Sequence, residues 1–101
     1  MTKTELIDLV AEKTGHTKKD CNEIVNTTFD SIMDYLTEEA EKNQETRDNV
    51  QIIGFGSFEV KDRKARQGRN PQNPEETIKI PARKVPTFRA GKTFKESVKN
   101  Q

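Results

Sequence analysis

The segment from Lys61 to Ile80 constrains the fold most, because it has the pattern of β-strands and almost no apolar side chains to bury. It reads KDRKARQGRNPQNPEETIKI, and apart from its prolines only Ala65, Ile78 and Ile80 are apolar. Nothing breaks a strand before Gly68, and the two Asn-Pro pairs that follow predict a turn. We therefore expect a long hairpin whose outer part needs a partner surface, since two strands alone are marginal in water.

The rest of the chain is also poor in apolar residues. Residues of the hydrophobic class make up 30% of the 101 positions, against 35% charged residues. An average globular chain is roughly 45–50% apolar when glycine is included. The length predicts one domain over residues 1–101. The composition predicts either partial disorder or a core that a second chain completes.

Charge is divided along the sequence. Residues 1–49 hold 6 Lys/Arg and 12 Asp/Glu, a net charge of −6, whereas residues 50–101 hold 12 Lys/Arg and 5 Asp/Glu, a net charge of +7. The two halves either neutralise each other in the fold or present a basic C-terminal half to an anionic partner.

Two helices are predicted in the first half. Thr2 and Glu5 form a capping-box pattern, and Gly15 suits the C-terminal end of that first helix. Thr17 marks a second start, and apolar residues then recur at helical spacing over residues 18–42. A helix-turn-helix reader of the major groove is disfavoured, because the second helix carries many acids and would be repelled by phosphates.

Residues 37–49 are polar, with only Ala40 as an apolar anchor, and are best interpreted as a solvated acidic linker or one or two further helical turns. The period then changes to that of strands, with a strand at 50–53, a turn at 54–56 and a strand from Ser57. A short last helix is predicted at 92–99.

Catalysis and metal binding are disfavoured, because the chain has one His, one Cys and no cluster with metal-ligand spacing. Cys21 falls on the apolar stripe of the second helix and His16 in a turn. We expect no enzyme activity, cofactor, metal or small-molecule substrate. No apolar run approaches the roughly 20 residues that span a membrane. The single cysteine makes the cytosol the default compartment.

The cations of the hairpin suggest nucleic acid. Five fall within nine positions, against one acid: Lys61, Arg63, Lys64, Arg66 and Arg69. Strand alternation places Arg63 and Arg69 on one face. Lys64 and Arg66 fall on the other, which suits an arm in a groove with phosphates on both sides. A solvated charge run would explain this cluster alone. The same half, however, adds further cations: Lys79, Arg83, Lys84, Arg89, Lys92 and Lys95.

Pro71, at the expected hairpin tip, has two interpretations. It is either a turn proline with a preset φ or an apolar wedge that enters between base steps from the minor groove. Such a wedge unstacks a step at a cost of about a few kcal/mol, offset by contacts to the bent duplex. The surrounding basic residues favour the wedge.

Several motifs together resemble the HU/integration host factor family of bacterial histone-like DNA-bending proteins. They are GFGSFEV at 54–60, KDRKARQGRNPQ at 61–72, KIPARKVPTFRAGKTFKESV at 79–98, TKTELIDLVAEKTG near the N-terminus and FDSI at 29–32. The resemblance covers nearly the whole chain, and GRNP within a basic arm is specific.

The resemblance implies an α+β fold: two N-terminal helices, a three-stranded antiparallel sheet with a long protruding β-arm, and a short C-terminal helix, in an intertwined homodimer. Residues 1–49 would form the helical dimerisation half, and 50–101 the β-saddle, the arm at 61–80 and the last helix. It implies that Pro71 intercalates and that a dimer core includes Phe29, Ile32, Phe55, Phe58 and Phe88. The implied DNA-binding residues are Lys3, Ser57, Lys61, Arg63, Lys64, Arg66, Arg69, Asn70, Pro71, Arg83, Lys84, Arg89, Lys92 and Lys95.

The implied function is sequence-tolerant binding and bending of double-stranded DNA for chromosome compaction in the bacterial nucleoid. Two alternatives stay open: a site-selective bender like integration host factor, and a protein-interaction module that uses the acidic 37–49 segment. RNA and nicked or bent DNA are further possible partners, because phosphate contacts do not identify the sugar. The chain departs from the family pattern in three ways: Asn73-Pro74 replaces a Thr-Gly turn, residues 37–49 are longer than usual, and the net charge of +1 is low.

Overall fold

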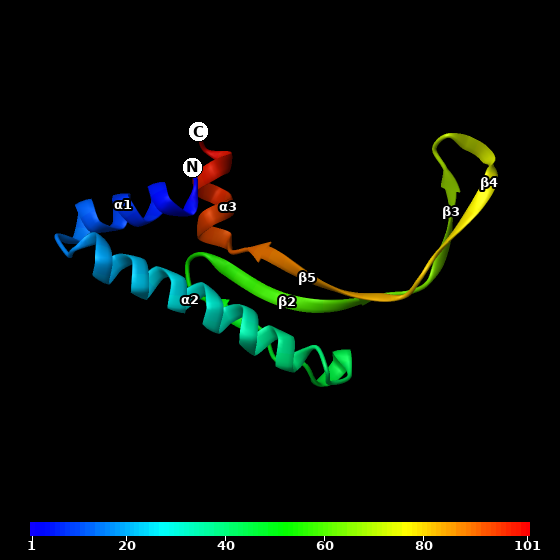
Figure 1. Cartoon of the computed structure of the whole chain (residues 1–101), viewed down its shortest axis with the longest axis horizontal. Helices are drawn as coiled ribbons and strands as arrows, with labels where there is room; N and C mark the ends of the chain where they lie inside the picture. Colours follow the sequence, from blue (N-terminus) through cyan, green and yellow to red (C-terminus); the bar gives the residue numbers. More distant parts are fainter. The chain divides into compact units, whose positions relative to one another are not determined.

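The computed structural model describes all 101 residues, which divide into two compact units, Met1–Tyr35 and Leu36–Gln101. The elements (Figure 1) are α1 (Lys3–Thr14), α2 (Lys18–Glu39), the 3-10 helix η1 (Gln44–Thr46), β1 (Val50–Ile52), β2 (Gly56–Arg63), β3 (Arg66–Asn70), β4 (Asn73–Ile80), β5 (Arg83–Ala90) and α3 (Lys92–Lys99). The expected α+β class and the order of its elements are confirmed. None of the helices is long and apolar enough to cross a membrane.

The predicted ends of the first helices are confirmed by their capping bonds. The Thr2 hydroxyl accepts the N–H of Glu5 at 3.1 Å, and the Thr17 hydroxyl accepts that of Asp20 at 3.1 Å. Gly15 ends α1 with φ 77°, a left-handed conformation that costs glycine little because it has no Cβ. Local sequence alone therefore determines where these helices begin and where α1 ends.

The first unit buries a small core of Ile7, Ala11 and Cys21, with Val10 and Val25 packed against it. Cys21 is 3% exposed, which confirms that it is a core residue. The apolar stripe of α2 extends beyond this core. Its exposed members are Ile24 (61%), Phe29 (43%) and Met33 (57%). The chain thus leaves a large part of this apolar face in contact with solvent.

The second unit is built on a three-stranded antiparallel sheet with the order β1-β2-β5. Gly56 begins β2 at a close approach, where an added Cβ would lie 2.5 Å from the carbonyl oxygen of Arg89 and 2.6 Å from the ring of Phe88. Pro86 lies in β5, opposite Val60. A proline has no backbone N–H to donate, which suits an edge strand, and β5 lies at the edge of this sheet.

Along the chain, β2 leads into β3 and β4 leads into β5. β3 and β4 form a separate two-stranded sheet that we call the arm (Figure 1). The pairing keeps one register throughout, from Gly56–Ala90 and Arg63–Arg83 to Arg66–Ile80 and Arg69–Thr77. The expectation that nothing breaks the strand before Gly68 is wrong, because Lys64 and Ala65 lie outside the strands. At this register Pro81 faces Ala65, and proline lacks the N–H that the ladder would need.

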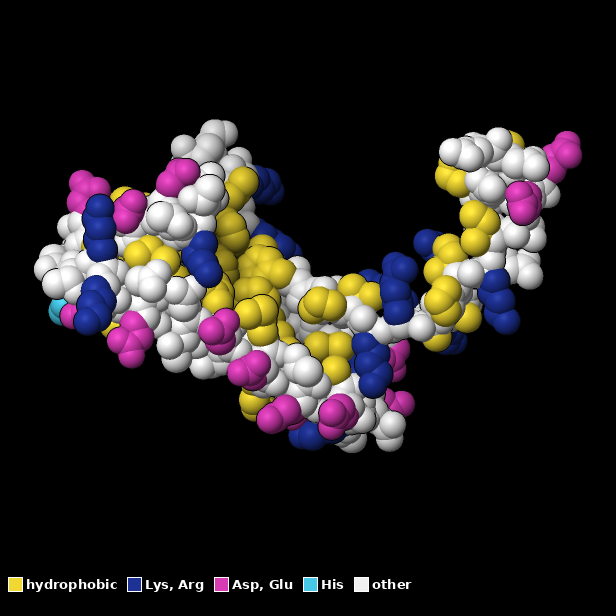
Figure 2. All heavy atoms as spheres, in the orientation of Figure 1, with side chains coloured by type: hydrophobic (Ala, Val, Ile, Leu, Met, Phe, Trp, Pro, Cys, Tyr) yellow, Lys and Arg dark blue, Asp and Glu magenta, His cyan; other side chains and the backbone are white.

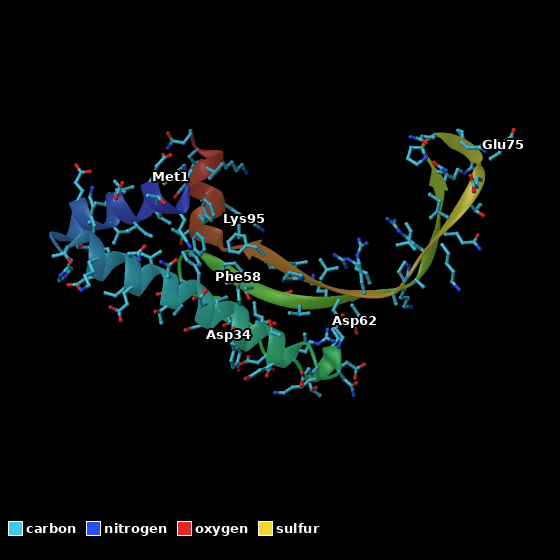
Figure 3. All side chains as sticks on the ribbon, in the orientation of Figure 1. Met1, Asp34, Phe58, Asp62, Glu75 and Lys95 are labelled. Atoms are coloured by element: carbon cyan, nitrogen blue, oxygen red, sulfur yellow. The ribbon has the colours of Figure 1, made fainter.

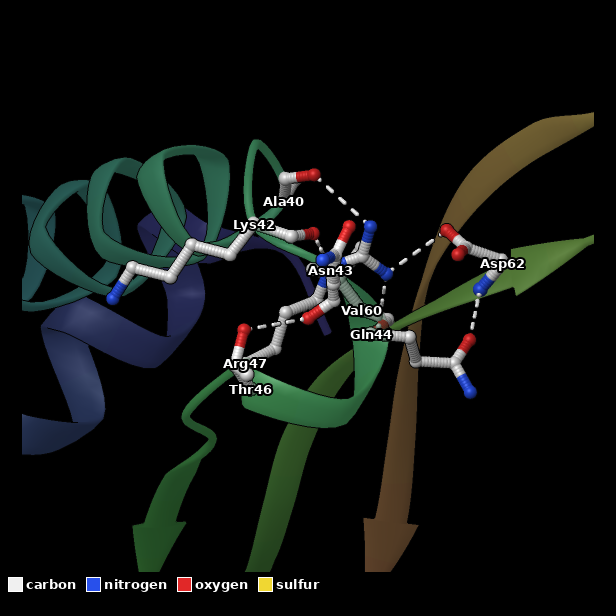
Figure 4. Close-up of polar contacts among 8 residues, drawn as sticks. All are labelled: Ala40, Lys42, Asn43, Gln44, Thr46, Arg47, Val60 and Asp62. Carbon is white, nitrogen blue, oxygen red and sulfur yellow. Dashed lines mark hydrogen bonds and ion pairs between the residues drawn. The ribbon is translucent and has the colours of Figure 1, made fainter.

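Residues 37–49 combine the two interpretations: α2 takes up the first three, η1 adds one short turn, and most of the other residues are exposed. α2 ends at Glu39, and the chain then folds back against β2 through the side chain of Arg47, which is only 4% exposed (Figure 4). Its guanidinium donates to three backbone carbonyl oxygens, those of Ala40 (3.0 Å), Lys42 (2.9 Å) and Val60 (3.2 Å). It also forms an ion pair with Asp62 at 3.0 Å. The Arg47 side chain thus binds carbonyl groups that lack helical partners after the end of α2, and connects them to β2, the strand that leads into the arm.

Glu39 adds a second polar anchor, and its side chain is 6% exposed. One carboxylate oxygen accepts the N–H of Asp48 at 2.7 Å, and the other contacts Nζ of Lys42 at 2.6 Å. The hydrogen bond from Lys42, followed by that from Asp48, lowers the pKa of Glu39. The same bond from Glu39 raises the pKa of Lys42. The segment is therefore held by paired charges and backbone bonds.

Four phenylalanine rings pack together on the second unit. Phe55 stacks on Phe94 at 5.5 Å between centroids, and Phe58 and Phe88 lie 4.9 Å apart. Such pairs contribute about 0.5–1.5 kcal/mol beyond the area that they bury. Phe55 and Phe88 nevertheless stay 42% exposed, and Phe94 stays 37% exposed. This cluster is an apolar surface as much as a core.

We predict that Arg47→Ala lowers the free energy of unfolding by about 2–4 kcal/mol, because three partly buried carbonyls lose a charged donor. Urea denaturation at a fixed protein concentration measures this change. Asp62→Asn is the control: Asp62 is 52% exposed, and losing an exposed ion pair costs less than about 1 kcal/mol. Equal losses in the two variants would assign the anchor to the ion pair instead of the carbonyls.

The lowered pKa of Glu39 predicts a pH dependence of stability. A carboxyl whose folded pKa is depressed stabilises the fold fully above its ordinary pKa, and loses that contribution as the pH falls through the lowered value. We therefore expect the difference in stability between the wild type and Glu39→Gln to shrink on acidification. Thermal unfolding between neutral and acidic pH checks this, with Glu41→Gln, a nearby exposed carboxyl, as the control. A difference that stayed constant with pH would contradict it.

Candidate nucleic-acid interface

The β2–β5 pair separates its charged side chains between two faces. Alternate residues of a strand share a face, and directly opposite residues share it too. The residues of one face, which we call the basic face, are Ser57, Glu59, Lys61, Arg63, Arg83, Val85, Thr87 and Arg89. The other face bears Phe58, Val60 and Phe88 along with Asp62 and Lys84. The basic face thus carries four cations and one acid, and the apolar residues that build the body lie behind it.

Arg63 and Arg83 lie directly opposite each other on the basic face, and both are exposed. Like charges at opposed positions of a sheet destabilise it. A polyanion bound over the pair would remove this repulsion and gain two phosphate contacts. The only acid of the face, Glu59, is paired with Lys61 at 3.7 Å. The arrangement therefore favours an anionic partner over the free state of the sheet.

The cations continue across the break between the two sheets. A pocket there is lined by Arg63, Lys64, Ala65, Arg66, Ile80, Pro81 and Arg83. Four of these residues are cationic, and the proline leaves the ladder open at this point. Figure 2 shows Lys and Arg side chains (dark blue) spaced along β2, β5 and the arm. The sequence predicted the cations on both sides of this break, and the pocket brings Arg63 and Arg83 of the β2–β5 pair close to Arg66 of the arm.

The arm has no buried residue. Arg66 shares one of its faces with Ile78 and Ile80, whereas Arg69 and Lys79 occupy the other. The expected hairpin with cations on both faces and no core of its own is therefore confirmed. Most of its polar surface is available to a partner on either side.

The arm ends in a two-residue turn, Pro71-Gln72. The N–H of Gln72 donates to the side-chain oxygen of Asn70 at 3.0 Å, so that Asn70 closes a turn around Pro71. Pro71 is exposed at the end of β3. The structure thus brings Asn70 and Pro71 together at the tip, where the sequence placed them.

Lys92 and Lys95 lie in the first turn of α3, after Arg89 at the end of β5. The N-cap of α3 is Gly91, which offers no side-chain acceptor to the first amides. Free N–H groups and two cations at a helix N-terminus favour phosphate. Figure 3 labels Lys95 on α3.

Three predicted residues differ from these exposed cations in their position or burial. Lys84 lies on the apolar side of the β2–β5 pair, opposite Asp62, and not on the basic face. The hydroxyl of Ser57 is on the basic face but buried, with no hydrogen-bond partner. Lys3 is exposed in α1, in the first unit.

The predicted dimer-core residues of the second unit, Phe55, Phe58 and Phe88, are brought together in the aromatic cluster. The sequence did not assign Phe94 to this cluster; the signal that could have done so is Val98, four residues further along α3, which gives that helix two apolar residues one turn apart. On α2, Phe29 is exposed and Ile32 half-buried. The sequence also missed Arg47, whose only signal was a lone cation in an acid-rich segment before a strand.

Comparison with known proteins decides the family. The model of the family described as "Bacterial DNA-binding protein" matches residues 1–99. The chain is 54% identical over 99 residues to DNA-binding protein HU-1 of Halalkalibacterium halodurans, covering 98% of this chain and 100% of that protein. The chain belongs to the HU family of bacterial DNA-binding proteins.

Other members of the HU family agree. DNA-binding protein HU of Geobacillus stearothermophilus is also 54% identical over 99 residues, with 98% of this chain and 100% of that protein covered. The Anabaena HU–DNA cocrystal structure is 43% identical, covers 97% of both chains and superposes with a TM-score of 0.81. This HU-family chain is therefore a histone-like, architectural DNA-binding protein.

The two faces of β5 predict different roles for adjacent cations of this HU-family protein. We expect Arg83→Ala to lower the slope of log K for duplex DNA against log salt by about 1, because a phosphate contact on the basic face is lost. Lys84→Ala removes the same charge from the other face and should change the slope much less. Fluorescence anisotropy titrations over a range of salt concentrations measure both. Equal changes would show that the face of the sheet does not select the contacts.

Proposed function

We propose that the chain acts as a homodimer that binds double-stranded DNA with low sequence specificity and bends it, as one DNA-binding domain over residues 1–101. The observation that carries this proposal is the basic face. It opposes Arg63 to Arg83 and passes in one register into an arm with no core. A bound polyanion would remove the repulsion between the opposed cations and give the arm a surface to pack against.

Phosphate contacts supply most of the affinity in this proposal. The residues assigned to the phosphates of the body are Lys61, Arg83, Arg89, Lys92 and Lys95, with Lys3 and Ser57 as implied by the family. Each phosphate that one of these cations neutralises releases a counterion, so binding weakens steeply with salt. None of these contacts reads a base edge, and the preference among duplexes then comes from how easily each sequence deforms.

The arm contributes the bend. Arg63, Lys64, Arg66, Arg69 and Asn70 follow the minor groove, and Pro71 enters between base steps at the tip. A proline suits this role because its ring is apolar and its φ is fixed, so that little conformational freedom is lost on insertion. Unstacking a step costs about a few kcal/mol, which the longer contact with bent DNA offsets.

The homodimer is supported by apolar surface that one chain leaves open. Phe29 and Met33 on α2, and Phe55, Phe88 and Phe94 in the aromatic cluster, are each more than a third exposed. Monomers rarely expose so many large apolar side chains, which usually mark an interface. A second copy would cover them and complete the core that the composition lacks.

The alternative functions, a site-selective DNA bender and a protein-interaction module, require different properties of the chain. A site-selective bender, like integration host factor, would need base or shape preferences that selection from random DNA reveals. Competition among duplex DNA, nicked DNA and RNA identifies the preferred nucleic acid. The interaction-module alternative loses support, because Arg47 holds the 37–49 segment against β2. With DNA as its partner, we place the protein in the bacterial cytoplasm, in the nucleoid, where it supports chromosome compaction.

The wedge is tested by Pro71→Ala. We expect reduced bending and a smaller loss of affinity, because the phosphate contacts remain while the inserted ring is lost. Energy transfer between dyes at the two ends of a short duplex measures the bend, and a titration of the same duplex measures affinity. Pro74→Ala is the matched control, since Pro74 follows the tip turn and has no assigned contact. Unchanged end-to-end transfer in Pro71→Ala would rule out the wedge.

A further inference from the structure

The arm tip contains an irregularity that the family resemblance did not explain. Arg69 pairs with Thr77, but the next residue of β3, Asn70, pairs with Asn73. β4 therefore holds three residues with no counterpart on β3, which are Pro74, Glu75 and Glu76. We call these three residues the tip bulge. A proline at its start suits an unpaired position, because it cannot donate to the ladder.

One side chain connects the tip bulge to the turn at Pro71. The amide nitrogen of Asn70 donates to Oε2 of Glu76 at 3.3 Å. The amide oxygen of Asn70 accepts the N–H of Gln72 at 3.0 Å. The amide group is planar, so the bond on its nitrogen fixes the direction of its oxygen. Glu76 thus restricts the group that closes the turn around Pro71.

The two hydrogen bonds leave part of the hydrogen-bonding capacity of the Asn70 side chain unused. A side-chain amide has two N–H donors and two acceptor lone pairs, and these bonds use one of each. Asn70 is half-buried at the tip, whereas Glu75 and Glu76 are exposed. A carboxylate at a DNA-binding tip opposes binding by its charge, so its presence beside Pro71 calls for a compensating role. The bond to Asn70 supplies one.

We propose that Glu76 is a positioning residue for DNA bending. It orients the Asn70 amide, and this amide holds the turn in the conformation that presents Pro71 to the duplex. The proposal rests on the proposed function, because it needs Pro71 to be the wedge. It assigns to Glu76 a gain in bending that exceeds the electrostatic effect of its charge on binding.

Glu75 provides a matched control within the tip bulge. It carries the same charge as Glu76, is exposed at the outer end of the arm (Figure 3) and has no hydrogen bond to Asn70. Removing one unit charge about 10 Å from a phosphate in water changes affinity by about twofold at most. Glu75→Ala therefore reports the charge effect alone, and Glu76→Ala reports the charge and the bond together.

The experiment compares Glu76→Ala, Glu76→Gln and Glu75→Ala with the wild type in the full-length protein. End-to-end energy transfer on a saturated short duplex measures the bend, and titration of the same duplex measures affinity. We expect Glu76→Ala to lose much of the bending that Pro71→Ala loses, while its affinity rises by about twofold at most or stays unchanged. Glu76→Gln keeps an oxygen that accepts from Asn70 and should restore the wild-type bend. Glu75→Ala should bend DNA like the wild type.

Three results would overturn the inference. Bending in Glu76→Ala equal to that in Glu75→Ala would show that the bond has no part in it. A loss in Glu76→Gln as large as in Glu76→Ala would assign the effect to charge. The third is additivity in the double variant Pro71→Ala/Glu76→Ala, because a residue that acts through Pro71 has little left to lose once the ring is gone.

The same measurements separate this inference from the proposed function. If Pro71→Ala bends DNA normally, the wedge fails, and the role of Glu76 fails with it. If Pro71→Ala loses the bend and Glu76→Ala does not, the wedge stands and only the positioning role of Glu76 is overturned. Both variants change the arm alone, so their unfolding transitions should match that of the wild type.

Discussion

The structure depends on a hairpin that keeps one register from its base to Arg69, near the tip, but buries apolar side chains only near its base. Near its base, Phe58 and Val60 pair with Phe88 and Pro86 and form the apolar side of the sheet. Beyond Arg63 the same register continues with no buried residue at all. The base can therefore be held by the chain itself, whereas the outer part is stable only against something else. Its charge determines that this partner is an anion.

DNA is stiff, so an arm that bends it must be attached firmly at its base. Polar side chains provide much of this attachment. Arg47 binds carbonyls at the end of α2 and on β2, next to the strand residues that lead into the arm. Buried charges are costly unless each is well paired, and here each of the three guanidinium nitrogens contacts an oxygen. A chain with few apolar residues thus anchors its working element through a hydrogen-bonded cation.

Much of the fold could be predicted from the sequence, because its signals are local. The caps at Thr2 and Thr17, the end at Gly15 and the helix at 92–99 each depend on a few neighbouring residues, and all are confirmed. The family motifs likewise located Pro71 and the arm cations. Arg47 and the break at Lys64 depend instead on residues distant in sequence: Val60 for the first and Pro81 for the second. The bond from Asn70 to Glu76 was missed because it spans an irregular register, which no periodicity reports.

Net charge describes this protein poorly, because its charges are sorted by position. The whole chain carries +1, yet the basic face carries four cations and a single acid that is already paired. At physiological salt the Debye length is about 8 Å, so a phosphate on that face responds mainly to the residues beside it. Acids elsewhere lower long-range attraction and the rate of encounter more than they weaken the contacts once formed. Glu75 and Glu76 differ from the other acids, because they lie at the tip itself and their charges act directly on a bound duplex. A structural role for Glu76 would explain why a carboxylate stands there.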